Sequence, residues 1–478
     1  MWPTDHTLAL LMFGLVPMVW VTAGVARRGV REATRLRFIS VLLTWVGYHL
    51  SPWIAFLSGD QWRSSLLVLQ LVDQGLLFSS FAMIALILGY DSHRTSNPRY
   101  FSPEPGQMPL PKVRIEHMLI LTLASLIVFL ILVGGPSEAW ASSSPRGFGQ
   151  FEARDSIGKL RQMAGVLSSV LYVAAAAAAV CALQCSRKLE HVLFGLACLM
   201  VTSFQWMWGF SRGAGAAWAF LGFWTIRTHG RSKALHAAVL ALLAFYMGWT
   251  GYTARGASNP GLRYYFAALL PFESRGEHPY ASPIPPPERN PMNAMEAWTR
   301  KAAQREIDNP SFLTNALNFA WNLQPLPSEL VSLRQTGRDL SEVMGTVGST
   351  GITTPALAEI YSVFGLSGAL SFLIFGRVLA WFDLISFHQG PLLSPILTTL
   401  CIFGIASGLH SSTRAMTRSL LYGFVLYCAP MLLRSRRSRR AGRSRPDGPE
   451  MPGRRNLPRG CPTAFSRLCM PKQVRPVM

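Results

Sequence analysis

A lone carboxylate, Glu359, follows a loop that is rich in glycine and hydroxyl side chains. Residues 345–354 read Gly-Thr-Val-Gly-Ser-Thr-Gly-Ile-Thr-Thr, and Pro355 then precedes an apolar stretch that contains Glu359. The helix dipole favours a carboxylate near the amino terminus of a helix, which is a structural reason for its presence. A carboxylate at the edge of an apolar region is also a candidate general base for a sugar hydroxyl. Glu359 is therefore the first candidate for proton transfer.

Arginines next to apolar stretches form a second chemically distinctive group. The set comprises Arg212 in the turn Ser211-Arg212-Gly213, Arg255 and Arg263 directly after one stretch, and Arg338 before another. Guanidinium groups bind phosphate oxygens in bidentate pairs and keep their charge at every accessible pH. Each arginine also has an ordinary explanation, such as contact with lipid headgroups or acids, or snorkelling from a loop. Together they are candidates for binding a ligand that contains phosphate.

Further polar residues lie between or within the last apolar stretches. His410 is a second candidate for proton transfer and Arg414 a further candidate for phosphate binding, although a basic surface hairpin explains both equally well. Asp73, Gln74 and Arg377 lie inside apolar stretches. We expect these three to pair inside a helix bundle and assign them no catalytic role.

The composition excludes an ordinary water-soluble globule. Of the 478 residues, 50% are hydrophobic and 14% are charged, whereas soluble domains carry roughly 25% charged residues. The formal net charge of +21 would suggest a nucleic-acid partner if it were spread over a folded surface. About half of it falls in residues 434–478, where thirteen Lys and Arg accompany two acids. We therefore expect a membrane protein with a basic tail and no nucleic-acid partner.

Eleven apolar runs have lengths suited to a bilayer core of about 30 Å, which needs roughly 20 helical residues. The runs are 8–25, 38–57, 66–89, 118–134, 163–183, 192–210, 214–226, 235–252, 357–381, 392–409 and 420–433. The sequence thus predicts an all-α, polytopic integral membrane protein with about 11 transmembrane helices. The seven cysteines lack the spacing of a zinc site or a disulfide framework. Residues 1–6 lack the basic residues of a cleavable signal, so the first helix should be retained.

Lys and Arg in the short loops predict the orientation, because basic loops stay cytoplasmic. The loops after the first, third, fifth and seventh runs hold fourteen of them, whereas the short loops of the other side hold three. The amino terminus is therefore predicted outside and the carboxyl terminus in the cytoplasm. The predicted organisation is helices 1–8 over 1–252, a large outer segment over 253–356, helices 9–11 over 357–433, and a basic, disordered or lipid-bound tail over 434–478.

The outer segment, 253–356, is the only extramembrane part that is long enough to hold a site. Its nine basic and nine acidic residues cancel, which argues against nucleic acid as a ligand. Residues 282–291 are rich in proline and predicted to be extended. Residues 293–307 have the spacing and composition of a helix, and 310–319 predict a second short helix.

Taken together, these features resemble the bacterial O-antigen and oligosaccharide repeat-unit polymerases of the Wzy type. The features are the Ser211-Arg212-Gly213 turn, the large outer segment late in the chain, and Gly351, Pro355, Glu359, Tyr361, Phe364-Gly365 and Gly368 around the start of the ninth run. The architecture resembles the family over nearly the whole chain up to Leu433, whereas the motif spans about 30 residues. The Arg-rich tail and the proline-rich stretch are not part of the family pattern.

The resemblance implies a GT-C-like, lipid-carrier-dependent glycosyltransferase that uses no metal and no cofactor. Such an enzyme joins polyprenyl-diphosphate-linked oligosaccharide repeat units into O-antigen, exopolysaccharide or capsule chains at the outer face of the bacterial inner membrane. Fixed arginines would stabilise the charge that builds on the leaving diphosphate. The implied diphosphate- and glycan-binding residues are Arg212, Arg255, Arg263, Arg338, Arg414 and Tyr361, and the implied proton acceptors are Glu359 and His410. Membrane lipids, a chain-length regulator and a flippase are the implied partners.

Two other functions stay open. A ligase of the same broad superfamily would transfer a finished glycan to a lipid or protein acceptor with the same arginines. A polysaccharide transporter or flippase is the alternative from another class. Against transport, the sequence shows neither a convincing inverted repeat nor a pair of interrupted midspan helices.

Overall fold

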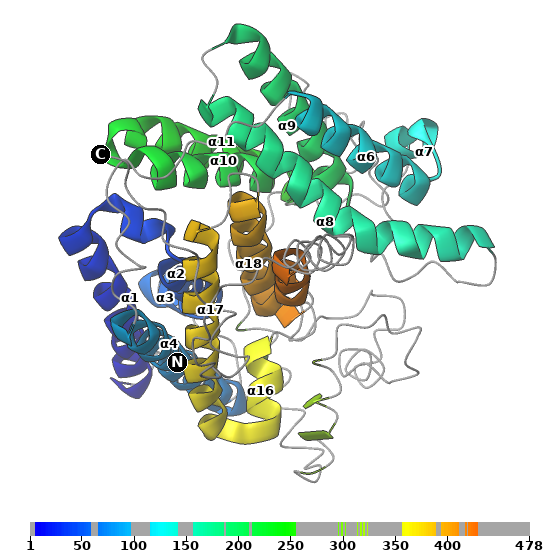
Figure 1. Cartoon of the computed structure of the whole chain (residues 1–478). Helices are drawn as coiled ribbons and strands as arrows, with labels where there is room; N and C mark the ends of the chain where they lie inside the picture. Colours follow the sequence, from blue (N-terminus) through cyan, green and yellow to red (C-terminus); the bar gives the residue numbers. More distant parts are fainter. Residues whose placement is uncertain are drawn as a thin grey trace, which may run out of the picture. The chain divides into compact units, whose positions relative to one another are not determined.

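The computed structural model describes residues 5–58, 66–96, 115–141, 156–185, 188–209, 213–254, 356–388 and 393–410, with further positions in 295–323 and 416–428. All regular structure among these residues is helical (Figure 1). The chain divides into two compact units, residues 1–427 and 428–478, and the labelled helices belong to the first. The predicted basic tail and the proline-rich stretch lie outside the described residues.

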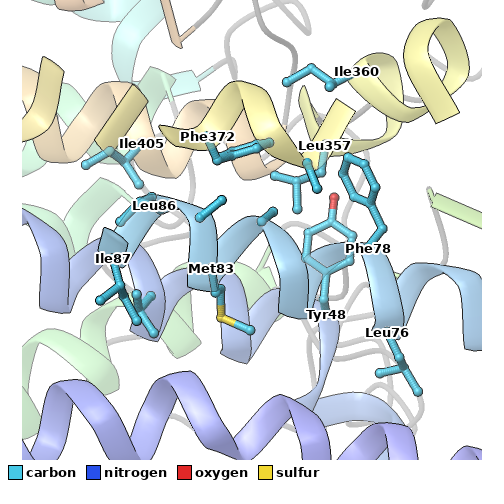
Figure 2. Close-up of a cluster of buried hydrophobic side chains, with 14 of the residues drawn as sticks. Tyr48, Leu76, Phe78, Met83, Leu86, Ile87, Leu357, Ile360, Phe372 and Ile405 are labelled. Carbon is cyan, nitrogen blue, oxygen red and sulfur yellow. The ribbon is translucent and has the colours of Figure 1, made fainter. Parts of the chain in front are cut away.

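A first core cluster joins helices from distant parts of the sequence. It draws on α1 (Asp5–Arg28), α2 (Leu36–Tyr48), α3 (Leu50–Ser58), α4 (Leu66–Ser96), α16 (Ala356–Phe364), η4 (Gly365–Leu370), α17 (Ser371–His388) and α18 (Leu393–His410). A 3-10 helix, η1 (Val30–Thr34), connects α1 to α2. Figure 2 shows side chains of α4, such as Met83 and Ile87, packed in this cluster with Phe372 and Ile405. Long-range packing therefore brings the two ends of the helical part together.

A second core cluster is built from the middle of the chain. Its helices are α6 (Ile115–Val133), α7 (Pro136–Ala141), α8 (Ser156–Cys185), α9 (Leu189–Gly209), α10 (Gly213–His229) and α11 (Ala234–Ala254), with η2 (Gly230–Lys233) between the last two. Small side chains let these helices approach closely, as in the alanine run 174–179 of α8, which is buried throughout. Ile396 and Leu400 of α18 also belong to this cluster, so α18 contacts both cores.

The protein is a helical membrane protein, as its composition predicts. Five helical stretches are long and apolar enough to cross a bilayer: His6–Arg28, Gln70–Ser96, Ile115–Val133, Leu189–Trp206 and Ala356–Ser386. Large apolar side chains on the outside of the bundle, such as Leu235, Leu242 and Phe245 of α11, are about 70% exposed or more, which suits lipid rather than water. Each of the eleven apolar runs coincides with helix over most of the residues that the structure describes in it, but a count of eleven spans and their orientation stay predictions.

Two of the runs expected as single helices are interrupted. The second run divides at His49 into α2 and α3, where Pro52 in the first turn of α3 lacks the backbone N–H that would continue a helix. The ninth run divides into α16, η4 and α17. Gly365 begins η4 with a φ of 61°, a left-handed conformation that glycine adopts without strain. Glu359 lies on α16, before this break.

Glycines set the contact between α4 and α17. A side chain on Gly376 of α17 would overlap the carbonyl oxygen of Leu86, and one on Gly89 of α4 would overlap the carbonyl oxygen of Leu373. The two backbones touch at this crossing, which is how small residues hold helices together in membranes. The crossing places the carboxyl-terminal half of α4 against the amino-terminal half of α17; Figure 1 shows both helices.

Candidate functional site

Two predicted site residues, Glu359 and Tyr361, have described side chains, and both lie on α16. His410 is the last residue of α18, and its side chain lies outside the described set. The arginines predicted to bind phosphate also lie outside it, namely Arg212, Arg255, Arg263, Arg338 and Arg414. The geometry therefore bears on the predicted proton acceptor and on what surrounds it.

Glu359 lies in the first turn of α16 and is buried, with 6% of its surface exposed. Its sequence neighbours Ala358 and Ile360 belong to the first core cluster. A carboxylate in apolar surroundings is costly unless dipoles, hydrogen bonds or charges stabilise it. The amino terminus of α16 supplies one such dipole. The charge of Glu359 also acts on Tyr48, the last residue of α2.

Tyr361 ties α16 to α4. Its hydroxyl donates a hydrogen bond to Oε1 of Gln74 over 2.6 Å. Its ring centroid lies 5.5 Å from that of Phe78, which is one turn further along α4 than Gln74. Tyr361 is thus engaged with the bundle through its hydroxyl and its ring, and it fixes the helix that carries Glu359. Its predicted role in glycan binding stays a prediction.

Trp298 brings the large outer segment into the same cluster. Its side chain is fully buried, and its Nε1 donates a hydrogen bond to the carbonyl oxygen of Leu71 over 3.1 Å. Its ring lies 4.5 Å from that of Tyr361, centroid to centroid. Gly75 of α4 makes the room, because a side chain there would come within 2.7 Å of Trp298 Nε1 and Met295 Sδ. The described residues Met295 and Trp298 therefore pack against α4, and Trp298 also packs against Tyr361 of α16.

The spacing of the anchor residues agrees with the predicted helix over 293–307. Residues 295, 298, 299 and 302 are helical, and Met295, Trp298 and Ala302 are buried. Three-, four- and seven-residue spacings place side chains on one helical face. The sequence predicted this helix but not its docking; the signal was the apolar spacing of these three residues, which reads as one face of an amphipathic helix.

Asp73, next to Gln74 on α4, is paired with the start of α1. Thr7 Oγ1 donates a hydrogen bond to Asp73 Oδ1 over 2.8 Å, and His6 Nδ1 lies 3.2 Å from Asp73 Oδ2. Asp73 and Gln74 therefore have polar partners, but these are not the partners that we expected. Arg377 does not join them, because its Nε donates to Ser92 Oγ near the other end of α4.

A second polar cluster surrounds Glu32 in η1, at the end of the bundle predicted to face the cytoplasm. Four guanidinium groups lie within 4.0 Å of its carboxylate, those of Arg28, Arg35, Arg37 and Arg94. Burial works to raise the pKa of Glu32, but these arginines, led by Arg94, outweigh it and lower the pKa below its ordinary value. Sequence analysis used these arginines only as an orientation signal and missed their shared carboxylate.

Asp383, which lies just beyond the predicted ninth run, is the centre of a third polar group. Its Oδ2 accepts hydrogen bonds from the Tyr90 hydroxyl over 2.5 Å and from the backbone N–H of Leu36 over 2.9 Å. Arg227 Nη1 lies 3.9 Å from Asp383 Oδ1, and Arg227 Nη2 donates to Ser386 Oγ. All these side chains are buried or nearly so. The group links α2, α4, α10 and α17 and has the character of a structural network.

The Glu359 region therefore offers one buried carboxylate, held on a helix that Tyr361 and Trp298 fix in place. Such a carboxylate can accept a proton or orient a hydroxyl. A cavity of about 370 Å³ lies elsewhere, between α10 and α11, and is lined by small and apolar residues such as Gly215, Gly222 and Phe223. Among the described residues, no three of His, Cys, Asp and Glu gather where they could share a metal ion. The metal-independent chemistry stays a prediction.

Comparison with known proteins gives no relative. No protein-family model, no curated protein and no solved structure matches the chain. The resemblance to repeat-unit polymerases therefore depends on the sequence features alone.

Proposed function

We propose that this protein polymerises polyprenyl-diphosphate-linked oligosaccharide repeat units at the outer face of the bacterial inner membrane. In this proposal it has the GT-C-like architecture of lipid-carrier glycosyltransferases, and Glu359 is the proton acceptor. The observation that carries the proposal is a buried carboxylate, 6% exposed, in the first turn of a short helix that Tyr361 joins to α4 by a hydrogen bond. It stands within the motif that resembles the family.

The proposed reaction is a glycosyl transfer. The acceptor sugar hydroxyl attacks the anomeric carbon of the donor repeat unit, its proton passes to the Glu359 carboxylate, and the bond from that carbon to the diphosphate oxygen breaks. The diphosphate leaves with the bonding electrons. Arg212, Arg255, Arg263, Arg338 and Arg414 are the proposed source of positive charge for the leaving group, because fixed guanidinium groups stabilise charge that develops in a transition state.

Buried surroundings support this role for Glu359. Charge–dipole and hydrogen-bond interactions are stronger in a medium of low effective dielectric constant than in water. A carboxylate that is held by its helix and excluded from water therefore interacts strongly with an approaching hydroxyl group. Positioned general bases contribute roughly 10²–10⁴ to the rate.

Glu359→Gln tests the proposal in a host strain that lacks its own gene for this protein. Wild-type protein should restore a ladder of long glycan chains on electrophoresis, and Glu359→Gln should reduce chain formation about 100-fold or more. Glu190→Gln, a change of an exposed acid on α9, serves as the matched control and should behave like wild type. Long chains from Glu359→Gln at normal protein levels would contradict the assignment.

The same strain separates the other functions. Loss of the polymerase leaves single repeat units attached to their final acceptor, whereas loss of a ligase leaves full-length polymer on the lipid carrier. Loss of a flippase would leave undecorated acceptors and unpolymerised repeat units on the cytoplasmic side. The first pattern is the one that the proposal predicts.

A further inference from the structure

Tyr48 carries a buried hydroxyl whose position calls for an explanation. The residue ends α2 and is 0% exposed. Its hydroxyl has no hydrogen-bond partner among the described residues. Removing a hydroxyl group from water without giving it a partner costs free energy, and buried hydroxyls therefore normally have one. Tyr90 and Tyr361 follow that rule in the same bundle, through Asp383 and Gln74.

The Tyr48 hydroxyl points toward the helix that carries Glu359. Figure 2 shows the ring beside Phe78, with its oxygen directed toward Leu357 in the first turn of α16. The Trp298 ring packs edge-on against Tyr48, with 6.1 Å between the ring centroids. Glu359, two residues after Leu357, is close enough for its charge to act on Tyr48. A hydroxyl without a partner among the described residues thus points toward the helix that carries a buried carboxylate.

We propose that Tyr48 is a positioning residue for Glu359, and that its hydroxyl donates a hydrogen bond to the Glu359 carboxylate when that carboxylate is ready to accept a proton. The bond would hold the carboxylate in one orientation and favour its charged form. This inference rests on the proposed function for its catalytic meaning, but the pairing itself is independent of the reaction. The Trp298 ring packs against Tyr48, and the Tyr361 ring packs against Trp298 in turn.

Tyr48→Phe is a sharp test because it removes one oxygen and keeps the ring. If Tyr48 were only a packing residue, loss of a hydroxyl without a partner would leave thermal stability unchanged or higher. Tyr172→Phe is the matched control, since Tyr172 is a buried tyrosine of the second core cluster, away from α16. Both variants keep the buried ring, so both should fold, and the melting temperatures of the purified proteins check this.

The first measurement needs no glycan substrate. A hydrophobic carbodiimide modifies protonated carboxyl groups in the membrane, and mass spectrometry reports the fraction of Glu359 modified. Without the hydrogen bond from Tyr48, a larger fraction of Glu359 should be protonated. Glu359 should therefore be modified several-fold faster in Tyr48→Phe than in wild type, and at the wild-type rate in Tyr172→Phe. The nearby ionisable groups on other helices, Asp73 of α4 and His6 of α1, are the same in all three proteins. Equal rates in Tyr48→Phe and wild type would overturn the pairing.

The second measurement is steady-state polymerisation with lipid-linked repeat units. Loss of a positioning bond to a charged group should lower kcat about 10- to 100-fold with little change in KM. Unchanged kcat in Tyr48→Phe, with an active wild type, would overturn the inference and leave the proposed function intact. If the wild type itself forms no polymer, the proposed function fails, and the carbodiimide rates alone decide whether Tyr48 and Glu359 form a pair.

Discussion

At the scale of single residues, two glutamates are buried in the part of the chain that the structure describes, and their surroundings differ. Glu32 is enclosed by guanidinium groups, of which Arg94 is the nearest at 2.6 Å. Glu359 lies among apolar and aromatic side chains with the Tyr48 hydroxyl nearby. A carboxylate held by several arginines is fixed as an anion and serves structure. Glu359 lies within the motif that resembles the polymerase family, which is why we propose chemistry for Glu359 and a structural role for Glu32.

The Glu32 cluster makes a pH-dependent contribution to stability. The pKa of Glu32 is lowered from its ordinary value of 4.5 in the folded protein, so the unfolded state binds the proton more readily. The contribution is therefore complete above about pH 4.5 and is lost as the pH falls through the lower, folded-state pKa. Glu32→Gln should lower the free energy of unfolding by about 3 kcal/mol at pH 7, because the arginines lose their shared counter-charge.

Thermal unfolding in detergent between pH 7 and pH 3 checks this prediction. The wild type should lose stability at the acid end, and the difference between wild type and Glu32→Gln should shrink there. Glu116→Gln, at an exposed acid in the first turn of α6, should follow the wild-type curve. A constant difference between wild type and Glu32→Gln at all pH values would refute the account.

At the scale of helices, α4 is the element around which the site is organised. Gln74 accepts a hydrogen bond from Tyr361, Gly75 leaves room for the Trp298 side chain, and Gly89 contacts the backbone of α17. The apolar run alone predicted a helix here, but not which of its faces would receive the outer segment. Small residues mark these faces, because only a backbone without a side chain lets a neighbour approach so closely.

Gly376→Ala should disturb the crossing of α4 and α17. The new methyl group would overlap the carbonyl oxygen of Leu86, which belongs to a helix backbone and cannot move aside cheaply. We expect a loss of about 1–3 kcal/mol in stability and less protein in the membrane. Gly423→Ala is the control, because the nearest atom to its methyl group would be 3.5 Å away. Melting temperatures that are equal for both variants would show that the crossing tolerates the methyl group.

At the scale of the whole molecule, the orientation of the chain in the membrane carries the functional argument. Glu359 and the outer arginines can meet a lipid-linked donor only if the segment 253–356 lies outside the cytoplasm. A green fluorescent protein fused after Met478 should fluoresce, since it folds in the cytoplasm, whereas alkaline phosphatase fused there should be inactive. The same two reporters inserted after residue 280 should give the reverse result. The same reporter result at both insertion points would contradict the predicted topology.

The sequence predicted the helices well because apolar length is a local property. Every predicted run corresponds to helix, but the breaks at His49 and Gly365 depend on a proline in a first turn and on a left-handed glycine. Packing partners were harder to foresee. Asp383 meets Leu36 and Tyr90 across more than 290 residues of sequence, and Trp298 meets α4 over 227; no local pattern encodes such pairs. The sequence therefore identified Glu359 as a candidate, whereas Tyr48 and Trp298 could be identified only from the structure.

The most direct measurement is polymerisation by the purified protein in liposomes supplied with polyprenyl-diphosphate-linked repeat units. The account predicts that wild-type protein forms glycan chains of increasing length and releases polyprenyl diphosphate. It predicts that Glu359→Gln forms about 100-fold fewer glycan chains. Transfer of repeat units across the bilayer without chain growth, or equal chain growth by wild type and Glu359→Gln, would contradict it.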